Sequence, residues 1–189
     1  MTEETNRTAK SELISKGVAL EKGIKITQQS NIDSLSSRGY GIIENNSLIL
    51  AFYEALYLLD KRILEVTSKK GDALDFQTIL RCYEKINENA WINYLIYRDL
   101  RSRGYVVRGG FGHGTDFRIY ERGSYGKNVA STLILSTQEG KPIAVDYLAN
   151  IIKRCQSQKK SLALAVMNRR GEIVYYSVSK LTFAKQSDV

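Results

Sequence analysis

The segment from residue 104 to residue 123, GYVVRGGFGHGTDFRIYERG, restricts the fold of this chain more than any other. Residues 105–107 are of types that favour strands, and a glycine-rich turn follows them. From residue 115 to 120, apolar Phe117 and Ile119 alternate with polar neighbours. Alternation with a period of two is typical of a strand with one buried face. The segment therefore predicts a β-hairpin.

A second pair of strands is predicted near the end of the chain. The run from Leu162 to Met167 is apolar and lacks polar alternation, which suits a strand buried on both faces. Residues 168–171, NRRG, form a turn signal, and a partner strand is expected from Ile173 to Val178. These segments would form the core of a small sheet.

One long helix is predicted upstream by apolar residues that recur at four, three and four positions: Phe52, Leu56, Leu59 and Ile63. Asn46 and Ser47 precede this stripe and are suitable N-caps. The pattern therefore favours a helix that begins near residue 47.

The remaining elements are shorter. The chain divides near residues 87–89, between two helical regions. We expect a hairpin at 18–26, a short helix at 31–38, a helix from Phe76, a helix that ends before Gly104, a strand at 130–135, and a helix opened by Pro142.

The overall charge suggests an acidic partner. Twenty-eight Lys and Arg residues oppose 20 Asp and Glu residues, for a net charge of +8 and a pI near 9.4. Such a balance favours RNA or DNA over a membrane, because no lipid-seeking segment is apparent. The polar start of the sequence lacks the apolar core of a signal peptide, so a cytoplasmic location is expected. Cys82 and Cys155 are far apart and suggest neither a disulfide framework nor a zinc site.

Several motifs together resemble one family. The runs YRDLRSRGYVVR and GTDFRIYERG, followed by KKSLALAV and GEIVYY, look like the catalytic domain of archaeal-type tRNA-splicing endonucleases. Upstream, EALYLLDKRILEV resembles the small domain that precedes it, so the resemblance spans about residues 18–180. It implies an α/β (α+β) protein with a small N-terminal α/β domain, residues 1–88. A C-terminal nuclease-like domain, residues 89–189, would carry a mixed central sheet flanked by helices.

The resemblance also implies a chemistry. Enzymes of this family cut RNA without a metal or other cofactor, by attack of the 2′-hydroxyl on the neighbouring phosphate, and they use a tyrosine, a histidine and a lysine. Tyr120 in YERG matches the tyrosine, and Lys160 in QKKSL matches the lysine. The position of the histidine is occupied by Ala130, which has no proton to donate. We therefore expect Tyr120 and Lys160 to be relics of a catalytic site.

Other residues are candidates for a substitute acid or for RNA contacts. The only histidine, His113, lies in the hairpin turn before Tyr120, and Arg122 and Lys127 lie near the vacant position. A family arginine that stacks on an intron base aligns with Lys153, and Lys159 stands where the family has another arginine. Lysine keeps the charge but lacks the planar group that stacks on a base.

The resemblance implies two contacts with partner subunits. C-terminal strands of the family pair two subunits tail to tail, which here involves Ile173, Val174, Tyr175 and Tyr176. A loop after the third strand docks into a basic pocket of a partner. In this sequence that loop falls at residues 136–141, and Glu139 is its only acidic residue.

These features lead to one main hypothesis and several alternatives. The main one is a structural, non-catalytic subunit that joins a catalytic subunit in a hetero-tetramer acting on precursor tRNA. The alternative is an active, metal-independent endonuclease that uses Tyr120 and Lys160 with a substitute acid. A metal-dependent nuclease would want a carboxylate pair near Asp116, and Gln158 stands where the second acid is needed. A general RNA-binding module would want RNP-like aromatics, which the sequence lacks.

Overall fold

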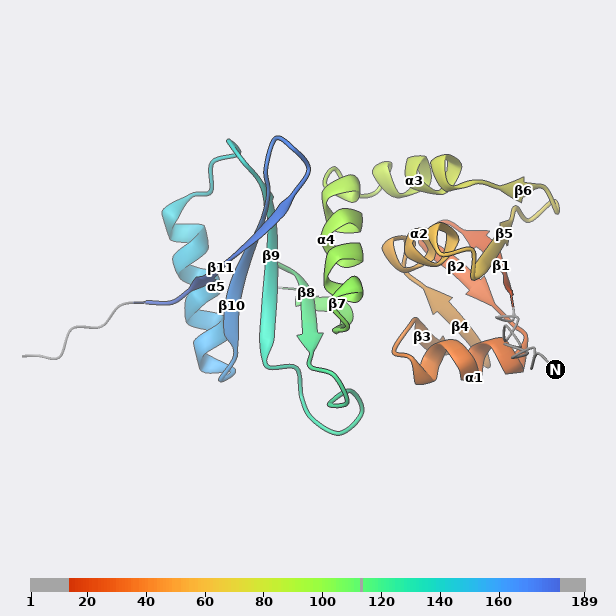
Figure 1. Ribbon diagram of the computed structural model, residues 1–189, viewed down its shortest axis with the longest axis horizontal. Helices are drawn as coiled ribbons and strands as arrows, with labels where there is room; N and C mark the ends of the chain where they lie inside the picture. Colours follow the sequence, from red (N-terminus) through yellow and green to blue (C-terminus); the bar gives the residue numbers. More distant parts are fainter. Residues whose placement is uncertain (1–13, 113, 181–189) are drawn as a thin grey trace, which may run out of the picture.

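The computed structural model describes residues 14–112 and 114–180, which form two β-sheets with helices between and beside them (Figure 1). The N-terminal elements are β1 (Ser15–Leu20), β2 (Gly23–Ile26), α1 (Gln29–Ser37), β3 (Ile42–Glu44), β4 (Ser47–Leu50), α2 (Phe52–Asp60), β5 (Leu64–Thr67), β6 (Ala73–Leu74) and α3 (Phe76–Glu84). The C-terminal elements are α4 (Ala90–Ser102), β7 (Val106–Gly112), β8 (Thr115–Tyr120), β9 (Thr132–Gln138), α5 (Val145–Ser157), β10 (Ser161–Met167) and β11 (Ile173–Val178). The predicted α/β (α+β) class is confirmed.

The C-terminal sheet has the strand order β11-β10-β9-β8-β7. Strands β7 and β8 pair antiparallel with Val106 opposite Tyr120, which confirms the hairpin predicted for residues 104–123. Strands β9 and β10 run parallel and are joined through α5, whereas β10 and β11 are antiparallel. The central sheet is therefore mixed, as expected.

Helices cover both faces of this sheet (Figure 1). On the α5 side, Leu162 of β10 belongs to a cluster with Ile151 and Cys155. On the α4 side, Ala165 and Met167 belong to the main core. Strand β10 is thus packed on both sides, which agrees with its unbroken apolar sequence.

The main core continues from the C-terminal sheet into the N-terminal part of the chain. The ring of Tyr53 on α2 lies 4.9 Å from the Tyr97 ring on α4 and 5.1 Å from the Phe117 ring on β8, measured between centroids. Helix α4 therefore lies between the two sheets, with α2 against it (Figure 1). The boundary proposed at residues 88 and 89 falls between α3 and α4 and stays a prediction.

The N-terminal sheet corrects one predicted element. The β1–β2 hairpin is present, but Asn46 and Ser47 do not begin a helix. Asn45 and Asn46 have positive φ angles of 46° and 56° and form the turn between β3 and β4. A two-residue hairpin turn needs positive φ at both positions, which asparagine tolerates. Helix α2 therefore begins only at Phe52, and it ends before Ile63.

Two predicted boundaries in the C-terminal part also move. Helix α5 begins at Val145, so Pro142 lies before the helix and not in its first turn. Strand β9 begins at Thr132 and continues to Gln138, so it takes up half of the stretch predicted as a docking loop at residues 136–141.

Candidate functional site

The topology of the C-terminal sheet brings Tyr120, Ala130 and Lys160, the three positions that the resemblance singles out, to one end of the sheet. Tyr120 is the last residue of β8, and Ile119 beside it pairs with Thr132 at the start of β9. Thr132 in turn pairs with Ser161 at the start of β10, next to Lys160. Strand β8 is antiparallel to β9, and β9 is parallel to β10. The end of β8 therefore lies beside the starts of β9 and β10.

The ring of Tyr120 packs against a second tyrosine. Its centroid lies 5.2 Å from that of Tyr125, and the ring planes are nearly perpendicular at 87°. Tyr125 also lies against Gly39 of the N-terminal part, where an added Cβ would approach its ring to 3.3 Å. Nothing in the local sequence distinguishes Tyr125 from other loop tyrosines, so its place beside Tyr120 was not predictable.

The C-terminus of α5 positions Lys160. Lys159 takes a left-handed conformation with φ of 54°. Its amide donates to Gln156 O, and the amide of Lys160 donates to Cys155 O, both at 2.9 Å. This is the Schellman pattern that commonly ends helices. The side chain of Lys160 then reaches Ala130, whose carbonyl oxygen accepts a hydrogen bond from Nζ at 2.5 Å.

Ala130 is buried, with 1% of its surface exposed. Its methyl group has no proton to exchange, and its carbonyl is bound to the Lys160 ammonium group. The site therefore places a phenol and an ammonium group near the end of the sheet, and position 130 supplies no acid or base.

The substitute acids considered from the sequence differ in their surroundings. The guanidinium group of Arg122 donates to Arg103 O at 3.0 Å and lies against Gly104, at the end of α4. An arginine also stays protonated and so does not act as an acid. Lys127 is exposed in the loop between β8 and β9. His113 lies outside the described residues.

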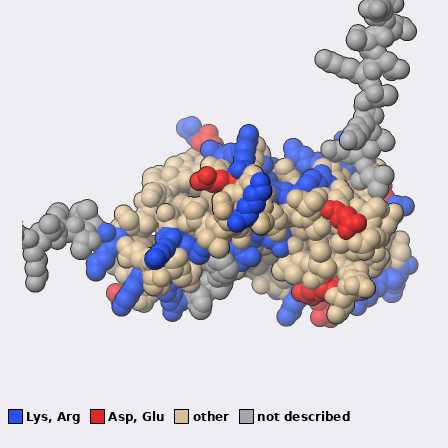
Figure 2. Space-filling view, turned by 90° about the horizontal axis from the view of Figure 1, so that it is seen from below, with Lys and Arg blue, Asp and Glu red and all other residues tan. Residues whose placement is uncertain are grey.

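The two predicted RNA-binding lysines are both exposed. Lys153 lies on α5, beside Gln156 and Lys180 around a hollow of about 520 Å³. Lys159 follows at the end of the same helix. Figure 2 views the molecule from below, and on this face basic side chains occur over both ends, whereas acidic ones gather in a few separate places. Such a surface is compatible with a polyanion.

The predicted docking residue Glu139 is bound within its own chain. One carboxylate oxygen accepts a hydrogen bond from Arg169 N at 3.1 Å, and the other lies 3.8 Å from Arg169 Nε. The Glu139 amide donates to Met167 O. The tip of this loop therefore packs against the β10–β11 turn.

The four predicted interface residues of β11 divide between two faces. Ile173 and Tyr175 pack against the main core, and the Tyr175 hydroxyl donates to Asp99 Oδ2 at 2.7 Å. Val174 and Tyr176 face outward, with 41% and 54% of their surfaces exposed. Only the second pair is available to a partner through its side chains.

The described residues were compared with the requirements of a metal site and of a membrane-spanning helix. In residues 14–112 and 114–180, no group of three or more His, Cys, Asp or Glu side chains is arranged to hold a metal ion. Within the same ranges, no helix has the length and apolar character needed to cross a membrane.

Comparisons with known proteins identify the family. The model for the catalytic C-terminal domain of tRNA intron endonuclease matches residues 90–175, and the model for its N-terminal domain matches residues 15–80. A tRNA-splicing endonuclease of Methanococcus vannielii is 32% identical over 161 residues, which cover 85% of this chain and 91% of the relative. The chain belongs to the tRNA intron endonuclease family.

A second relative in the tRNA intron endonuclease family is similar over nearly the same share of the chain. A tRNA-splicing endonuclease of Pyrococcus abyssi is 27% identical over 158 residues, covering 83% of this chain and 91% of the relative. The match includes both domains, so the predicted family is confirmed. These comparisons support a function in the splicing of tRNA introns.

Proposed function

We propose that this chain is the structural, non-catalytic subunit of a heteromeric tRNA-splicing endonuclease that removes introns from precursor tRNA. The observation that carries the proposal is Ala130, which is buried and bound to Lys160 at the position of the family histidine. The fold is kept around a position that no longer transfers a proton.

The family reaction explains why this position matters. A 2′-hydroxyl attacks the adjacent phosphate and leaves a 2′,3′-cyclic phosphate and a 5′-hydroxyl end. The 2′-hydroxyl must lose a proton, and the leaving 5′-oxygen must gain one, while a cation stabilises the charge on phosphate. Tyr120 and Lys160 retain the phenol and the cation. Loss of a positioned acid or base typically lowers the rate by about 10² to 10⁴.

The proposal implies a catalytic subunit with a complete set of the three residues. Two catalytic and two structural chains would form a hetero-tetramer in the cytoplasm. The outward side chains of β11, Val174 and Tyr176, are suited to a contact between subunits, because they are apolar or aromatic and exposed. The net charge of +8 is suited to binding precursor tRNA.

One observation favours the alternative of an active endonuclease. Tyr120 and Lys160 still lie at the same end of the sheet, so two of the three family positions keep both residue type and place. In that case Lys127 would be the first candidate acid, because Arg122 is bound to Arg103 O.

A cleavage assay distinguishes the structural subunit from the active endonuclease. Intron-containing precursor tRNA is incubated without divalent metal, with this chain alone and with a paralogue from the same source that carries all three residues. We expect cyclic phosphate ends from the mixture, and at least about 100-fold slower cleavage by this chain alone. Cleavage by this chain alone at the rate of the mixture would overturn the proposal. Loss of that activity in Lys127→Ala would then support the alternative.

A further inference from the structure

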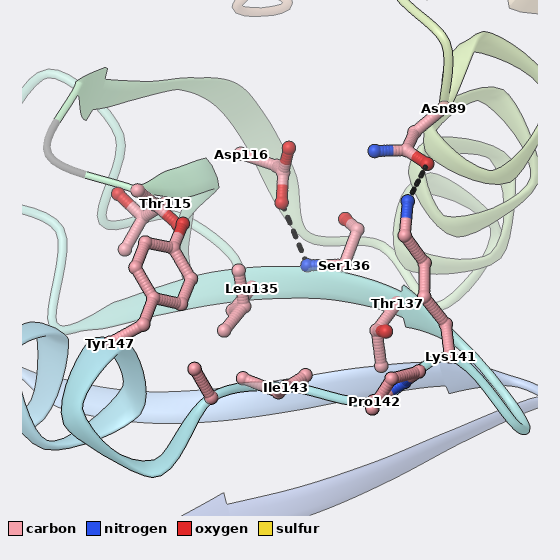
Figure 3. Close-up of a pocket in the computed structure, with 12 residues that line it drawn as sticks. Asn89, Thr115, Asp116, Leu135, Ser136, Thr137, Lys141, Pro142, Ile143 and Tyr147 are labelled. Atoms are coloured by element: carbon pink, nitrogen blue, oxygen red, sulfur yellow. Dashed lines mark hydrogen bonds between the residues drawn. The ribbon is translucent and has the colours of Figure 1, made fainter.

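A cavity of about 360 Å³ has strands β8 and β9 on one side and the segment that leads into α5 on the other (Figure 3). We call it the β8–β9 cavity. Asp116 lies on this cavity near the start of β8, whereas Tyr120 ends the same strand. The cavity is therefore separate from the Tyr120 site. Its volume is in the range of small-molecule sites, which starts at about 300 Å³.

The Asp116 carboxyl group keeps unused hydrogen-bonding capacity. Its Oδ2 accepts from Ser136 N at 2.7 Å, and its Oδ1 accepts from Asn93 Nδ2 at 3.5 Å. A carboxylate has about four acceptor positions, so further donors can be accommodated. Burial also raises the pKa of Asp116, which means that a donor from a ligand would stabilise the ionised form.

Two buried atoms beside Asp116 have no hydrogen-bond partner of good geometry in the described part of the chain. They are Ser136 Oγ and Asn93 Oδ1. Ser136 lines the cavity, and Asn93 binds Asp116 directly. The Ser136 side chain also lies near the Asp116 carboxylate, and the Asn93 side chain lies near Tyr83, so each has a polar neighbour. Ser136 Oγ can still form a hydrogen bond with a group that enters the cavity.

The walls of the cavity are apolar on one side and charged at the rim. Figure 3 shows Asp116 and Ser136 on one side, and Tyr147, Ile143 and Pro142 along the other. At the rim, the ammonium group of Lys141 binds Glu88 at 3.2 Å and Asn89 at 3.3 Å. The cavity therefore has apolar and aromatic side chains along one wall, a buried acceptor group on the other and a cation at the rim.

We propose that the β8–β9 cavity binds a guanine nucleotide, either free or as an unpaired guanosine of an RNA. Guanine presents two adjacent N–H donors, N1 and N2, which match the oxygens of Asp116. Its planar ring suits the wall that contains Tyr147 and Pro142, and its phosphate suits Lys141.

Other ligands match less well. Adenine places a ring acceptor beside its amino group, and this acceptor would face the carboxylate oxygens. An arginine side chain has the right donors for Asp116, but it carries no anion for Lys141, and the two positive charges would repel each other. Guanine nucleotides satisfy both ends of the cavity.

The test is calorimetric titration of the full chain with guanosine 5′-monophosphate, adenosine 5′-monophosphate and guanosine. We expect saturable binding of guanosine monophosphate, at least about tenfold tighter than adenosine monophosphate, because a paired donor contact discriminates bases by that factor or more. Absence of saturable binding at millimolar concentration, or equal binding of the two nucleotides, would overturn the proposal.

Three variants locate the binding. Asp116→Asn should abolish the preference for guanine. It should also fold, because the new amide oxygen can accept from Ser136 N, and rotation of the Asn93 amide by half a turn would bring its Oδ1 to the new amino group in place of Nδ2. Lys141→Gln should remove the advantage of the nucleotide over guanosine. Asp146→Asn, an exposed carboxyl on α5 outside the lining, is the matched control and should bind as the unaltered chain does. Unchanged base preference in Asp116→Asn would contradict the assignment.

A competition experiment separates the two sources of guanine. Displacement of guanosine monophosphate by a single-stranded RNA with unpaired guanosines, but not by the same RNA with adenosines, would assign the cavity to RNA. Binding of the mononucleotide without such displacement would assign it to the free nucleotide. Displacement by an arginine-containing peptide at lower concentration than by guanosine monophosphate would overturn the proposal. The titration needs no partner subunit, so its result is independent of the proposed function.

Discussion

Arg108 of β7 joins the N-terminal and C-terminal parts of the chain from within the core. Its guanidinium group donates to Gly39 O at 3.0 Å, to Gly41 O, and to Glu54 Oε1 at 3.2 Å. Glu54 also accepts from the amides of Gly41 and Ala51. Burial raises the pKa of Glu54, and the charge of Arg108 opposes this shift. The pair therefore depends on both partners being present.

Replacement of this arginine should be costly. Arg108→Met leaves Glu54 buried without its counter-charge, so we expect the free energy of unfolding to fall by about 3–5 kcal/mol. Arg103→Met is the control, because Arg103 is 53% exposed and its pair with Asp99 lies at the surface. That variant should lose at most about 1 kcal/mol. Urea denaturation measures both, and equal losses would contradict this role of Arg108.

Asp116 should make the stability of the protein depend on pH. Burial raises the pKa of the Asp116 carboxyl in the folded state above its ordinary value, so the folded protein binds the proton more tightly than the unfolded chain. The free energy of unfolding should therefore fall as pH rises from about 4 through the folded pKa. Asp116→Asn removes this titration, and its unfolding free energy should decline less between pH 4 and pH 7. A steeper decline in the variant, measured by urea denaturation at each pH, would refute the expectation.

Residues that act across long sequence distances were not predictable. Tyr120, Lys160 and Ala130 could be proposed as site residues only because the family resemblance fixes their places next to recognisable strands, and this assignment stays a prediction. Arg108 and Glu54 are 54 positions apart, and no local pattern links them. Tyr125 and Gly39 meet only after the two parts of the chain pack together.

At the scale of single elements, the end of α5 stores strain at Lys159. A left-handed conformation costs an L-residue about 1–2 kcal/mol, and glycine adopts it freely but loses more entropy on folding. Lys159→Gly should therefore raise the free energy of unfolding by about 0.5 kcal/mol. Lys159→Ala should give no gain. Equal effects of the two variants in urea denaturation would show that the left-handed backbone at residue 159 does not lower the free energy of unfolding.

Two neighbouring tyrosines of β11 allow effects on folding and effects on association to be measured separately. Tyr176→Glu changes an exposed side chain, so monomer stability should stay within about 0.5 kcal/mol while binding to a catalytic subunit weakens. Tyr175→Phe removes a hydrogen bond to Asp99, so stability should fall by about 1–2 kcal/mol while the outward face stays intact. Sedimentation with the partner subunit, together with denaturation of each variant, measures both effects. Intact association of Tyr176→Glu would exclude this face as the contact.

The elements themselves were predictable where periodicity and length agreed. The hairpin at residues 104–123 and the strand from Leu162 to Met167 are found as expected. Residues 47–50 form strand β4 and not the predicted start of a helix, because a short apolar run fits a strand or a helix equally well. Pro142 precedes α5 but does not open it, since proline also suits extended segments.

At the scale of the whole molecule, one core joins both parts of the chain. Residues from α2, α4 and the C-terminal sheet belong to the same buried cluster. The resemblance predicted two domains, but not that the two parts of the chain would share a core. The family comparison explains the arrangement, because both domains are matched in their usual order. If the proposed function holds, a partner chain supplies the catalytic groups.

The most direct test of the proposed subunit role is single-turnover cleavage of precursor tRNA by the reconstituted complex, with Tyr120→Phe and Lys160→Gln placed in this chain alone. Thermal melting of each variant controls for folding, since Lys160 also binds Ala130 O. We predict that the rate stays within about twofold of the unaltered complex, because the partner chain supplies the reacting groups. A loss of about 100-fold or more, the size expected for a catalytic acid or base, would contradict the account and assign chemistry to this chain.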